Sequence, residues 1–276
     1  MKTSIILATY NWDKALDIIL YNLSKQLKKK SDIEIIIADD GSNSATDEII
    51  KKYQMKFECI KHVWHEDIGF RKASILNKAA ALSTGDYLIF LDGDCIPFTD
   101  YISEHIDLAE NKYFVAGNRV LLSRKFTQEV LNQPQIINNV VKWRLFHWLF
   151  AKFKKNVNKI SPRLKIKNGK WRYWRSQNWK YPKGCNFALW RSDFMAVNGF
   201  DEEFSGWGHE DADLFIRLLH SGVKIKDGRF SVPVLHLWHK ESERSREKSN
   251  KDKLLQRVDD VSFIQAQSGI SQYLSK

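Results

Sequence analysis

The sequence is poor in cysteine and has no apolar run long enough to cross a bilayer. Its three cysteines, Cys59, Cys95 and Cys185, are scattered and form no CxxC pair. This argues against a disulfide framework or a thiolate zinc scaffold and is typical of a reducing compartment. The longest apolar runs, such as Ile33–Ala38 and Tyr87–Leu91, are strand-sized, whereas a membrane helix needs about 20 residues.

The sequence also has no zinc-protease pattern and no internal repeat. Met1–Ile5 leads directly into a strand-like run, which is unlike a signal peptide, so we expect a cytoplasmic protein. No HExxH pattern occurs, which argues against a metalloprotease. With 43% hydrophobic and 13% aromatic residues, the 276-residue chain can bury a full core, as one large α/β domain or two small ones.

Acidic residues are absent from one long stretch. Between Glu129 and Asp193 there is none, while 15 Lys or Arg and six of the ten tryptophans fall there. The rest of the chain is mildly acidic, although the net charge is +11. This composition predicts affinity for an anionic membrane face, an acidic glycan or a single-stranded nucleic acid. A solvated charged surface over core tryptophans would look the same.

Strand and helix patterns alternate along the first hundred residues. Short β-branched runs predict strands over Ser4–Thr9, Ile33–Ala38, Phe57–Trp64 and Tyr87–Leu91. Helical spacing predicts helices over Lys14–Leu27, Thr46–Tyr53 and Arg71–Leu82. Such alternation with short loops is typical of an α/β fold with a mostly parallel sheet flanked by helices.

The second half continues with less regular spacing. Its expected elements are helices over Asp100–Glu110, Glu210–His220 and Leu254–Gln267 and strands over Tyr113–Leu121, Asn186–Trp190 and Ser231–Trp238.

Polar clusters follow the predicted strands where each one ends. They are Thr9-Tyr10-Asn11, Asp39-Asp40, His65-Glu66-Asp67 and Asp92-Gly93-Asp94. Ligands of parallel sheets bind outside the carboxyl ends of the strands, so we expect a binding site there. The two carboxylates of Asp92-Gly93-Asp94 suit a hard divalent cation, which would offset their burial. An ordinary strand-to-turn Asp-Gly signal would give the same triplet.

Two later clusters also suggest chemistry. Gly206-Trp207-Gly208 precedes Glu210 and Asp211 at a predicted helix start, where a carboxylate can act as a general base or can simply cap the helix. His239 follows the last predicted strand, where it is free to turn back as a metal ligand, and His236 is the alternative. A lone histidine is more often an ordinary core or surface group.

Taken together, these motifs resemble a known family. Four motifs resemble the nucleotide-sugar half of GT-A family 2 glycosyltransferases: Thr9-Tyr10-Asn11, Asp39-Asp40-Gly41-Ser42, Gly69-Phe70-Arg71-Lys72 with Asn77, and Asp92-Gly93-Asp94. The later motifs resemble the acceptor half of β-1,4-galactosyltransferases and bacterial chondroitin-polymerase-type transferases: Lys183-Gly184-Cys185-Asn186-Phe187, Asn198-Gly199-Phe200-Asp201 and Gly206–Asp211. The resemblance implies a GT-A (Rossmann-like) fold with a nucleotide-sugar half at 1–122, a basic aromatic segment at 123–182, an acceptor half at 183–240 and a helical tail at 241–276.

The resemblance also implies an activity: inverting, Mn²⁺- or Mg²⁺-dependent transfer of a glucose, galactose or N-acetylhexosamine unit from a UDP-sugar. The acceptor would be a hydroxyl of a bacterial surface glycan such as lipopolysaccharide core or capsule, which can be lipid-linked. The implied donor-binding residues are Thr9, Tyr10, Asn11, Asp40, Arg71, Lys72, Asp92 and Gly93. Of these, Arg71 or Lys72 would lie near the diphosphate, and Asp92 would contact the ribose or the metal. The implied acceptor or sugar contacts are Gly184, Asn186, Trp207 and Gly208. Asp211 would be the base, with Glu210 beside it, and Asp94 with His239 or His236 would hold the metal.

The basic aromatic segment matches no motif of that family. We expect it to dock on the acceptor or on an anionic membrane, which would place the protein in the cytoplasm or peripherally on the cytoplasmic face of the inner membrane. A nucleic-acid-binding module is an alternative from the same segment, but the strand-end carboxylates would repel phosphates without a metal. A non-catalytic glycan-binding protein is another alternative. We expect no nucleic-acid partner.

Overall fold

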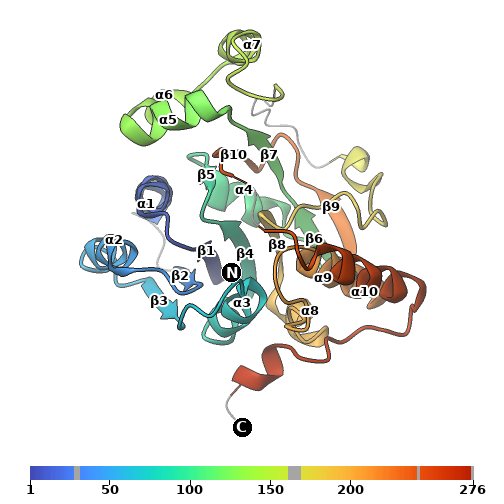
Figure 1. The fold of residues 1–276 in the computed structure, drawn as a ribbon. Coiled ribbons are helices and arrows are strands. Elements are labelled where there is room, and N and C mark those ends of the chain that lie inside the picture. Colours follow the sequence, from blue (N-terminus) through green and yellow to red (C-terminus); the bar gives the residue numbers. More distant parts are fainter. Residues whose placement is uncertain (28–31, 161–168, 241–242, 275–276) are drawn as a thin grey trace.

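A seven-stranded sheet forms the centre of the computed structural model, which describes residues 1–27, 32–160, 169–240 and 243–274 (Figure 1). Its strands are Thr3–Thr9 (β1), Ile33–Asp39 (β2), Ile60–Trp64 (β3), Tyr87–Asp92 (β4), Tyr113–Ala116 (β6), Asn186–Trp190 (β8) and Lys224–Asp227 (β9). The order is β3-β2-β1-β4-β8-β6-β9, and only β8 runs antiparallel to its neighbours. The expected mostly parallel α/β sheet is confirmed.

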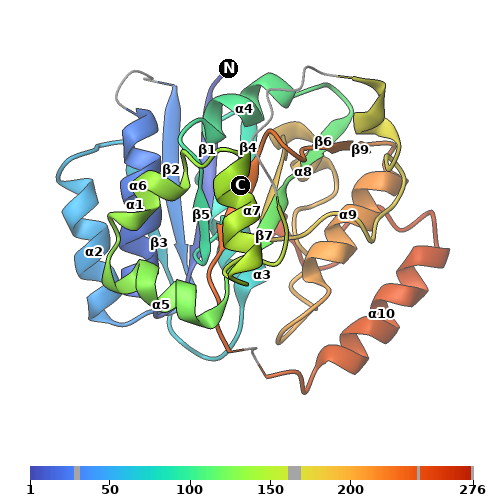
Figure 2. The same cartoon turned by 90° about the horizontal axis from the view of Figure 1, so that it is seen from above.

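Helices cover both faces of this sheet. One face carries α1 (Asp13–Leu27), α2 (Ser44–Gln54) and α4 (Tyr101–Leu108). The same core extends to α5 (Arg124–Asn132), α6 (Ile136–Val140) and α7 (Leu145–Phe153), which lie beside the strands of a second, smaller sheet (Figure 1). The other face carries α3 (Lys72–Ala81), α8 (Arg191–Ala196), α9 (Glu210–His220) and the 3₁₀ turn Ile270–Tyr273. Helix α10 (Glu247–Asp259) packs outside α9 (Figure 2), and a 3₁₀ turn, Lys170–Tyr173, packs beside β9.

Alternation along the strands divides the interior into two cores. In β1, Ile5 and Leu7 face the core under α1, whereas Ile6 and Ala8 face the core over α3. Because successive strand side chains point to opposite faces, a continuous apolar strand fills both cores at once. This explains why the β1 sequence reads as an unbroken apolar run.

A second, three-stranded sheet has the order β5-β10-β7. It contains Cys95–Pro97 (β5), Asn118–Leu121 (β7) and Pro233–His236 (β10). The single strand predicted over Tyr113–Leu121 is therefore wrong, because the chain changes sheets at Gly117. A Cβ atom on Gly117 would lie 2.3 Å from the side chain of Asn186, so only glycine fits this crossing.

Some predicted bounds differ from the structure. The last helix begins at Glu247 and ends at Asp259, earlier than the predicted Leu254–Gln267. Strand β9 and the three short helices α5 to α7 were not predicted. Residues 161–168 of the basic aromatic segment lie outside the described residues. Among the helices that the structure describes, none combines the length and the apolar character that a bilayer-spanning helix requires.

A buried ion-pair cluster ties α9 and α10 to the loop before them. The Asp213 carboxylate accepts from Arg217 Nε at 2.8 Å and from Arg257 Nη1 at 2.6 Å. Arg257 Nη2 also lies 2.8 Å from the Asp201 carboxylate. Arg217, Asp213 and Asp201 are fully buried. The Asn198–Asp201 motif thus contributes to the support of α9, whose first turn carries Glu210 and Asp211.

Removal of one charge from this cluster should destabilise the protein strongly. Asp213→Asn would leave two arginines without their shared carboxylate, and breaking a buried pair from one side costs about 3–5 kcal/mol. The matched control is Asp252→Asn on the exposed side of α10, for which we expect a change below about 0.5 kcal/mol. Urea unfolding of the two variants measures the difference, and equal midpoints would contradict the assignment.

Candidate functional site

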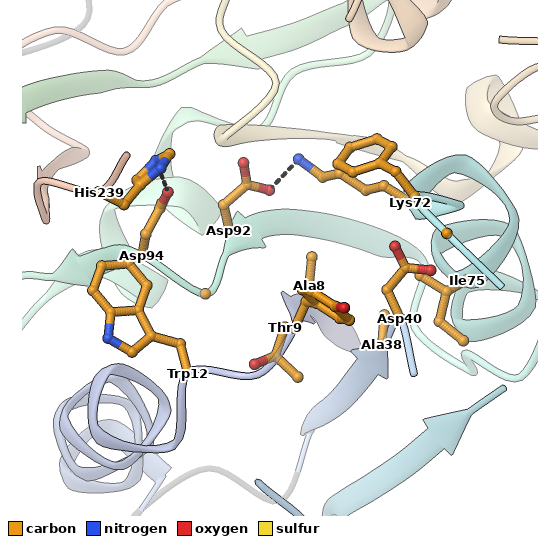
Figure 3. A pocket seen from close by; sticks show the side chains of 14 residues that line it. Ala8, Thr9, Trp12, Ala38, Asp40, Lys72, Ile75, Asp92, Asp94 and His239 are labelled. Carbon is orange, nitrogen blue, oxygen red and sulfur yellow. Dashed lines mark ion pairs between the residues drawn. The ribbon is translucent and has the colours of Figure 1, made fainter. Parts of the chain in front are cut away.

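The carboxyl ends of β1, β2 and β4 surround a cavity of about 350 Å³. Figure 3 shows Asp94, His239 and Trp12 at one end, Asp40 and Ile75 at the other, and Asp92 with Lys72 between them. The residues predicted for the site that line the cavity are Thr9, Tyr10, Asp40, Lys72, Asp92, Gly93, Asp94 and His239. The expected convergence of the strand ends is therefore present. Trp12 also lines the cavity, although no motif in the sequence singled it out.

Asp40 is fixed at the far end of this cavity. Its Oδ1 lies 2.7 Å from His65 Nε2, and its Oδ2 accepts from the Arg71 backbone N–H at 3.0 Å. Burial raises the pKa of the Asp40 carboxyl, and the His65 hydrogen bond opposes this effect. The carboxyl keeps unused lone pairs toward the cavity, with which it can accept from an N–H donor of a ligand.

The loop after β1 presents Tyr10. Asn11 adopts a left-handed backbone, φ 45°, and its N–H donates to Ser42 Oγ at 2.9 Å, which ties this loop to the loop after β2. Tyr10 remains 52% exposed while its hydroxyl donates to Asp67 at 2.9 Å. Its ring is thus held at the cavity mouth with a free face. The Thr9 hydroxyl is buried and has no hydrogen-bond partner among the described residues.

Lys72 and Asp92 form an ion pair inside the cavity. Lys72 Nζ lies 2.6 Å from Asp92 Oδ1. Burial disfavours the charge on Lys72, but Asp92, together with Glu210 and Asp211, outweighs this effect and raises the Lys72 pKa. The sequence left Arg71 and Lys72 as equal candidates for a diphosphate contact. In the structure Lys72 lines the cavity, whereas the Arg71 side chain donates to the Glu66 carbonyl.

Asp94 meets two histidines. Asp94 Oδ2 lies 3.1 Å from His239 Nε2 and 3.3 Å from His236 Nε2. Burial disfavours the charged carboxylate, but the His239 hydrogen bond and the nearby His236 lower the pKa of Asp94 to about 2. Pairing of β10 with β5 places His236 opposite Cys95 and so brings it beside Asp94. The structure therefore brings both candidate histidines to the same carboxylate.

The arrangement of these three side chains fits a divalent cation. Nδ1 of His236 and Nδ1 of His239 lie 2.8 and 2.9 Å from backbone carbonyl oxygens, which can only accept, so Nδ1 carries the proton in each ring. In the charged ring of His239, the Nε2–H donates to Asp94, and loss of that proton leaves a lone pair that can bind a cation. Asp94, Cys95 and His236 have ligand atoms within 4.8 Å of one another and could hold a metal ion, and His239 Nε2 adds a further nitrogen 3.1 Å from the same carboxylate. The buried Cys95 thiol lies nearby and donates to Asp94 Oδ1 at 3.1 Å.

Glu210 and Asp211 begin α9, as the sequence predicted. The loop before them contains three left-handed residues, Gly206, Gly208 and His209, with φ of 73°, 107° and 76°. Asp211 Oδ2 accepts from the Gly184 N–H at 2.8 Å. A Cβ atom on Gly184 would lie 2.4 Å from that oxygen, so glycine is required for this contact. Asp211 is thus oriented by the backbone of another segment.

Glu210 lies deeper than Asp211. It is buried, and its Oε2 has no hydrogen-bond partner within the described chain. Burial, with the adjacent Asp211 charge as a second cause, raises the Glu210 pKa to about 7. Glu210 therefore exists in both protonation states near neutral pH and can donate or accept a hydrogen bond.

The remaining candidate residues do not line the cavity. Asn186 is buried, and its side chain bonds to Tyr101, to His105 and to the Val232 carbonyl, so its hydrogen bonds are internal. Trp207 is partly exposed with Arg244 stacked 4.7 Å from its ring centroid. An acceptor contact at these positions stays a prediction.

Comparisons with known proteins show which sequences this chain is similar to. Residues 163–240 match the family described as N-terminal domain of galactosyltransferase. Validoxylamine A glucosyltransferase of Streptomyces hygroscopicus subsp. limoneus is 28% identical over 240 residues, which cover 83% of this chain and 50% of that protein. Chondroitin synthase of Escherichia coli is 27% identical over 255 residues, covering 86% of this chain and 34% of that one. The chain thus spans half or less of these relatives.

Solved structures show the same fold at low sequence identity. A fragment of Staphylococcus aureus TarS, residues 1–349, has a TM-score of 0.59 at 15% identity over 99% of this chain and 68% of that one. The mannosyltransferase PcManGT of Pyrobaculum calidifontis, solved with GDP-Man and Mn²⁺, has a TM-score of 0.58 at 15% identity, with the same two coverages. The expected GT-A fold is confirmed. Since residues 4–177 match the family described as Glycosyl transferase family 2, the chain belongs to that family.

Proposed function

We propose that this chain transfers a sugar from a UDP-sugar to a glycan hydroxyl with inversion at the anomeric carbon and with Mn²⁺ or Mg²⁺ as cofactor. One observation carries the proposal: a single cavity is lined by Asp40 at one end, by Asp94 and His239 at the other and by Lys72 between them, and the Glu210–Asp211 pair acts electrostatically on Lys72. Similarity to a TarS fragment solved with UDP supports the choice of donor class.

In this proposal the donor lies along the cavity. Asp40 accepts from the uracil N–H, and the exposed ring face of Tyr10 stacks on the base. Lys72 lies where it can pair with the diphosphate, and Asp92 holds Lys72 in place at 2.6 Å. Asp94, His239 and His236 would hold the cation. When bound, this cation would offset the charge that builds up on the diphosphate leaving group.

Asp211 is the proposed general base. Its carboxylate takes the proton of the acceptor hydroxyl while the hydroxyl oxygen bonds to the anomeric carbon and the bond to the UDP oxygen breaks. The Gly184 N–H at 2.8 Å keeps one carboxylate oxygen oriented for this step. Glu210 beside it, with a pKa of about 7, can donate a hydrogen bond to a sugar hydroxyl in its protonated form. We propose a bacterial surface polysaccharide as the acceptor, since relatives include chondroitin synthase and hyaluronan synthase.

Helix α7 offers a surface for peripheral membrane binding. Its outward side exposes large apolar side chains, including Phe146 at 74% and Phe153 at 84%, while Trp148 and Ala151 face the core. Lys152 and Lys154 lie in and directly after its last turn. An exposed apolar face flanked by lysines suits the interface of an anionic bilayer. Such binding would hold the enzyme near a lipid-linked acceptor on the cytoplasmic side.

Metal removal should abolish turnover. We expect one UDP-sugar of a panel to release UDP slowly in the presence of Mn²⁺, with water in place of the acceptor. Asp94→Ala and His239→Ala should each lower this rate by about 100-fold or more, because several kcal/mol of charge stabilisation are lost. Asp107→Ala, an exposed carboxylate on α4, serves as the control. A rate unaffected by EDTA, or no binding of UDP in calorimetry, would overturn the proposal.

The two carboxylates at the start of α9 should differ in their effects. Asp211→Asn should keep UDP affinity but lower the rate of sugar transfer to water by about 10²- to 10⁴-fold, because the proton acceptor is lost. The wild-type rate should fall as pH rises through about 7, where Glu210 loses its proton, and Glu210→Gln should remove that fall. A near-normal rate in Asp211→Asn would show that the base assignment is wrong.

Binding to anionic vesicles should depend on salt and on α7. We expect the chain to sediment with phosphatidylglycerol vesicles at low ionic strength and to be released as salt is added. Phe146→Ser with Phe153→Ser should lower binding by about tenfold, since two exposed rings lose their membrane contact. Met55→Ser, at an apolar side chain that is 83% exposed outside this helix, is the control. Binding that ignores salt, or that survives the double substitution, would contradict this assignment.

A further inference from the structure

A second cavity, of about 550 Å³, lies outside the proposed donor site and has a positively charged lining. Five of its lining residues are cationic: Arg119, Lys159, Arg175, Lys180 and Lys183. The other described lining residues are uncharged, and none of them is acidic. The cavity therefore gathers cations from β7, from the chain after α7 and from the segment before β8.

These cations are not neutralised within the part of the chain that the structure describes. Lys159 Nζ donates to the neutral Asn118 Oδ1 at 2.6 Å, and Arg119 lies 3.9 Å from Cys185 Sγ. Arg175 stacks on the Tyr181 ring at 4.6 Å. No described carboxylate comes within 4.0 Å of any of the five. Burial first, and then the charges of Arg119, Arg229 and Lys183, lower the Lys159 pKa. The cluster repels itself, which an anion would relieve.

Asp227, which bonds to the lining residue Tyr181, is already engaged. Asp227 is 1% exposed, accepts from the Tyr181 hydroxyl at 2.7 Å and pairs with Arg229 Nε at 2.7 Å. Asp227 therefore holds the lining residue Tyr181 in place and is paired with Arg229. The five cations thus line a cavity whose neighbouring carboxylate, Asp227, is already paired with Arg229.

The second cavity adjoins the proposed catalytic groups. Lys183 directly precedes Gly184, whose N–H holds Asp211 at 2.8 Å. Arg119 lies on β7, which pairs with β10 and thus with the strand that ends at His236. A ligand in this cavity would therefore approach Asp211 from outside the proposed donor site. That is the side from which an acceptor hydroxyl would come.

We propose that this cavity binds a negatively charged group, a carboxylate or a phosphate, on the acceptor glycan, so that acidic acceptors are selected. Arginine and lysine donors make strong charge-assisted hydrogen bonds to both groups. A concave pocket suits a few sugar units, whereas a nucleic acid strand needs a continuous groove with stacking surfaces. The acceptor role rests on the proposed transferase function, whereas anion binding itself does not.

The test separates this cavity from the donor site by filling the latter. UDP with Mg²⁺ is titrated first and kept saturating, so that a phosphate probe cannot report from the donor cavity. Glucose 6-phosphate, glucuronic acid and glucose are then titrated by ligand-observed NMR at low salt. We expect the two acidic sugars to bind and glucose not to bind. The stronger of the two acidic probes identifies the anionic group.

Two charge-matched double variants assign the binding. Lys159→Gln with Arg175→Gln should weaken binding of the acidic sugars by about tenfold or more, since two charge-assisted contacts are lost. Lys142→Gln with Lys154→Gln removes the same charge outside the cavity and should change affinity less than about twofold. Equal losses in the two variants, or no binding of either acidic sugar, would overturn this inference. Absence of UDP binding would instead contradict the proposed donor, and the pair of variants would still locate the anion.

Discussion

Repulsion among carboxylates at one edge of the central sheet is the constraint on which this site depends. Asp40, Asp92, Asp94, Glu210 and Asp211 converge there from two strand ends and one helix start. Burial of like charges is costly unless each has its own compensation. Four of them have it: His65, Lys72, the histidine pair and the Gly184 N–H. No described residue bonds to Glu210 Oε2, and the Glu210 pKa is raised to about 7.

Pairing within the second sheet brings one of these compensating groups, His236, to the edge of the central sheet. Gly117 lets the chain leave the large sheet, so that β7 can pair with β10 and β10 can carry His236 to Asp94. The buried Asn186 side chain fills the space that a Cβ atom on Gly117 would need, and it bonds to the Val232 carbonyl near β10. Asn186, for which the family resemblance implies an acceptor contact, therefore also packs at the junction between the two sheets.

The parts of this structure that follow from local pattern were predictable, and the parts that depend on remote contacts were not. Strand β1, helix α9 and the convergence of strand ends follow from apolar periodicity and from the geometry of parallel sheets. The break at Gly117 did not, because its cause is a side chain almost 70 positions away at Asn186. The choice between Arg71 and Lys72 depends on side-chain direction, which spacing alone does not give. The basic aromatic segment was predicted to dock on the acceptor or on an anionic membrane. Its described residues include both an exposed helix, α7, and part of the lining of the second cavity.

In the proposed reaction, two anionic substrates would have to bind close together. A nucleotide diphosphate and an acidic glycan repel each other, and the repulsion grows as water is excluded between them. The cavity at Asp94 is itself acidic and can accept a diphosphate only together with a cation, whereas the second cavity supplies fixed lysines and arginines. Under the proposed function, separate compensation would allow the two substrates to bind independently and would leave Asp211 between a metal-dependent side and a metal-independent side. Loss of the metal should then remove donor binding without removing binding of an acidic acceptor.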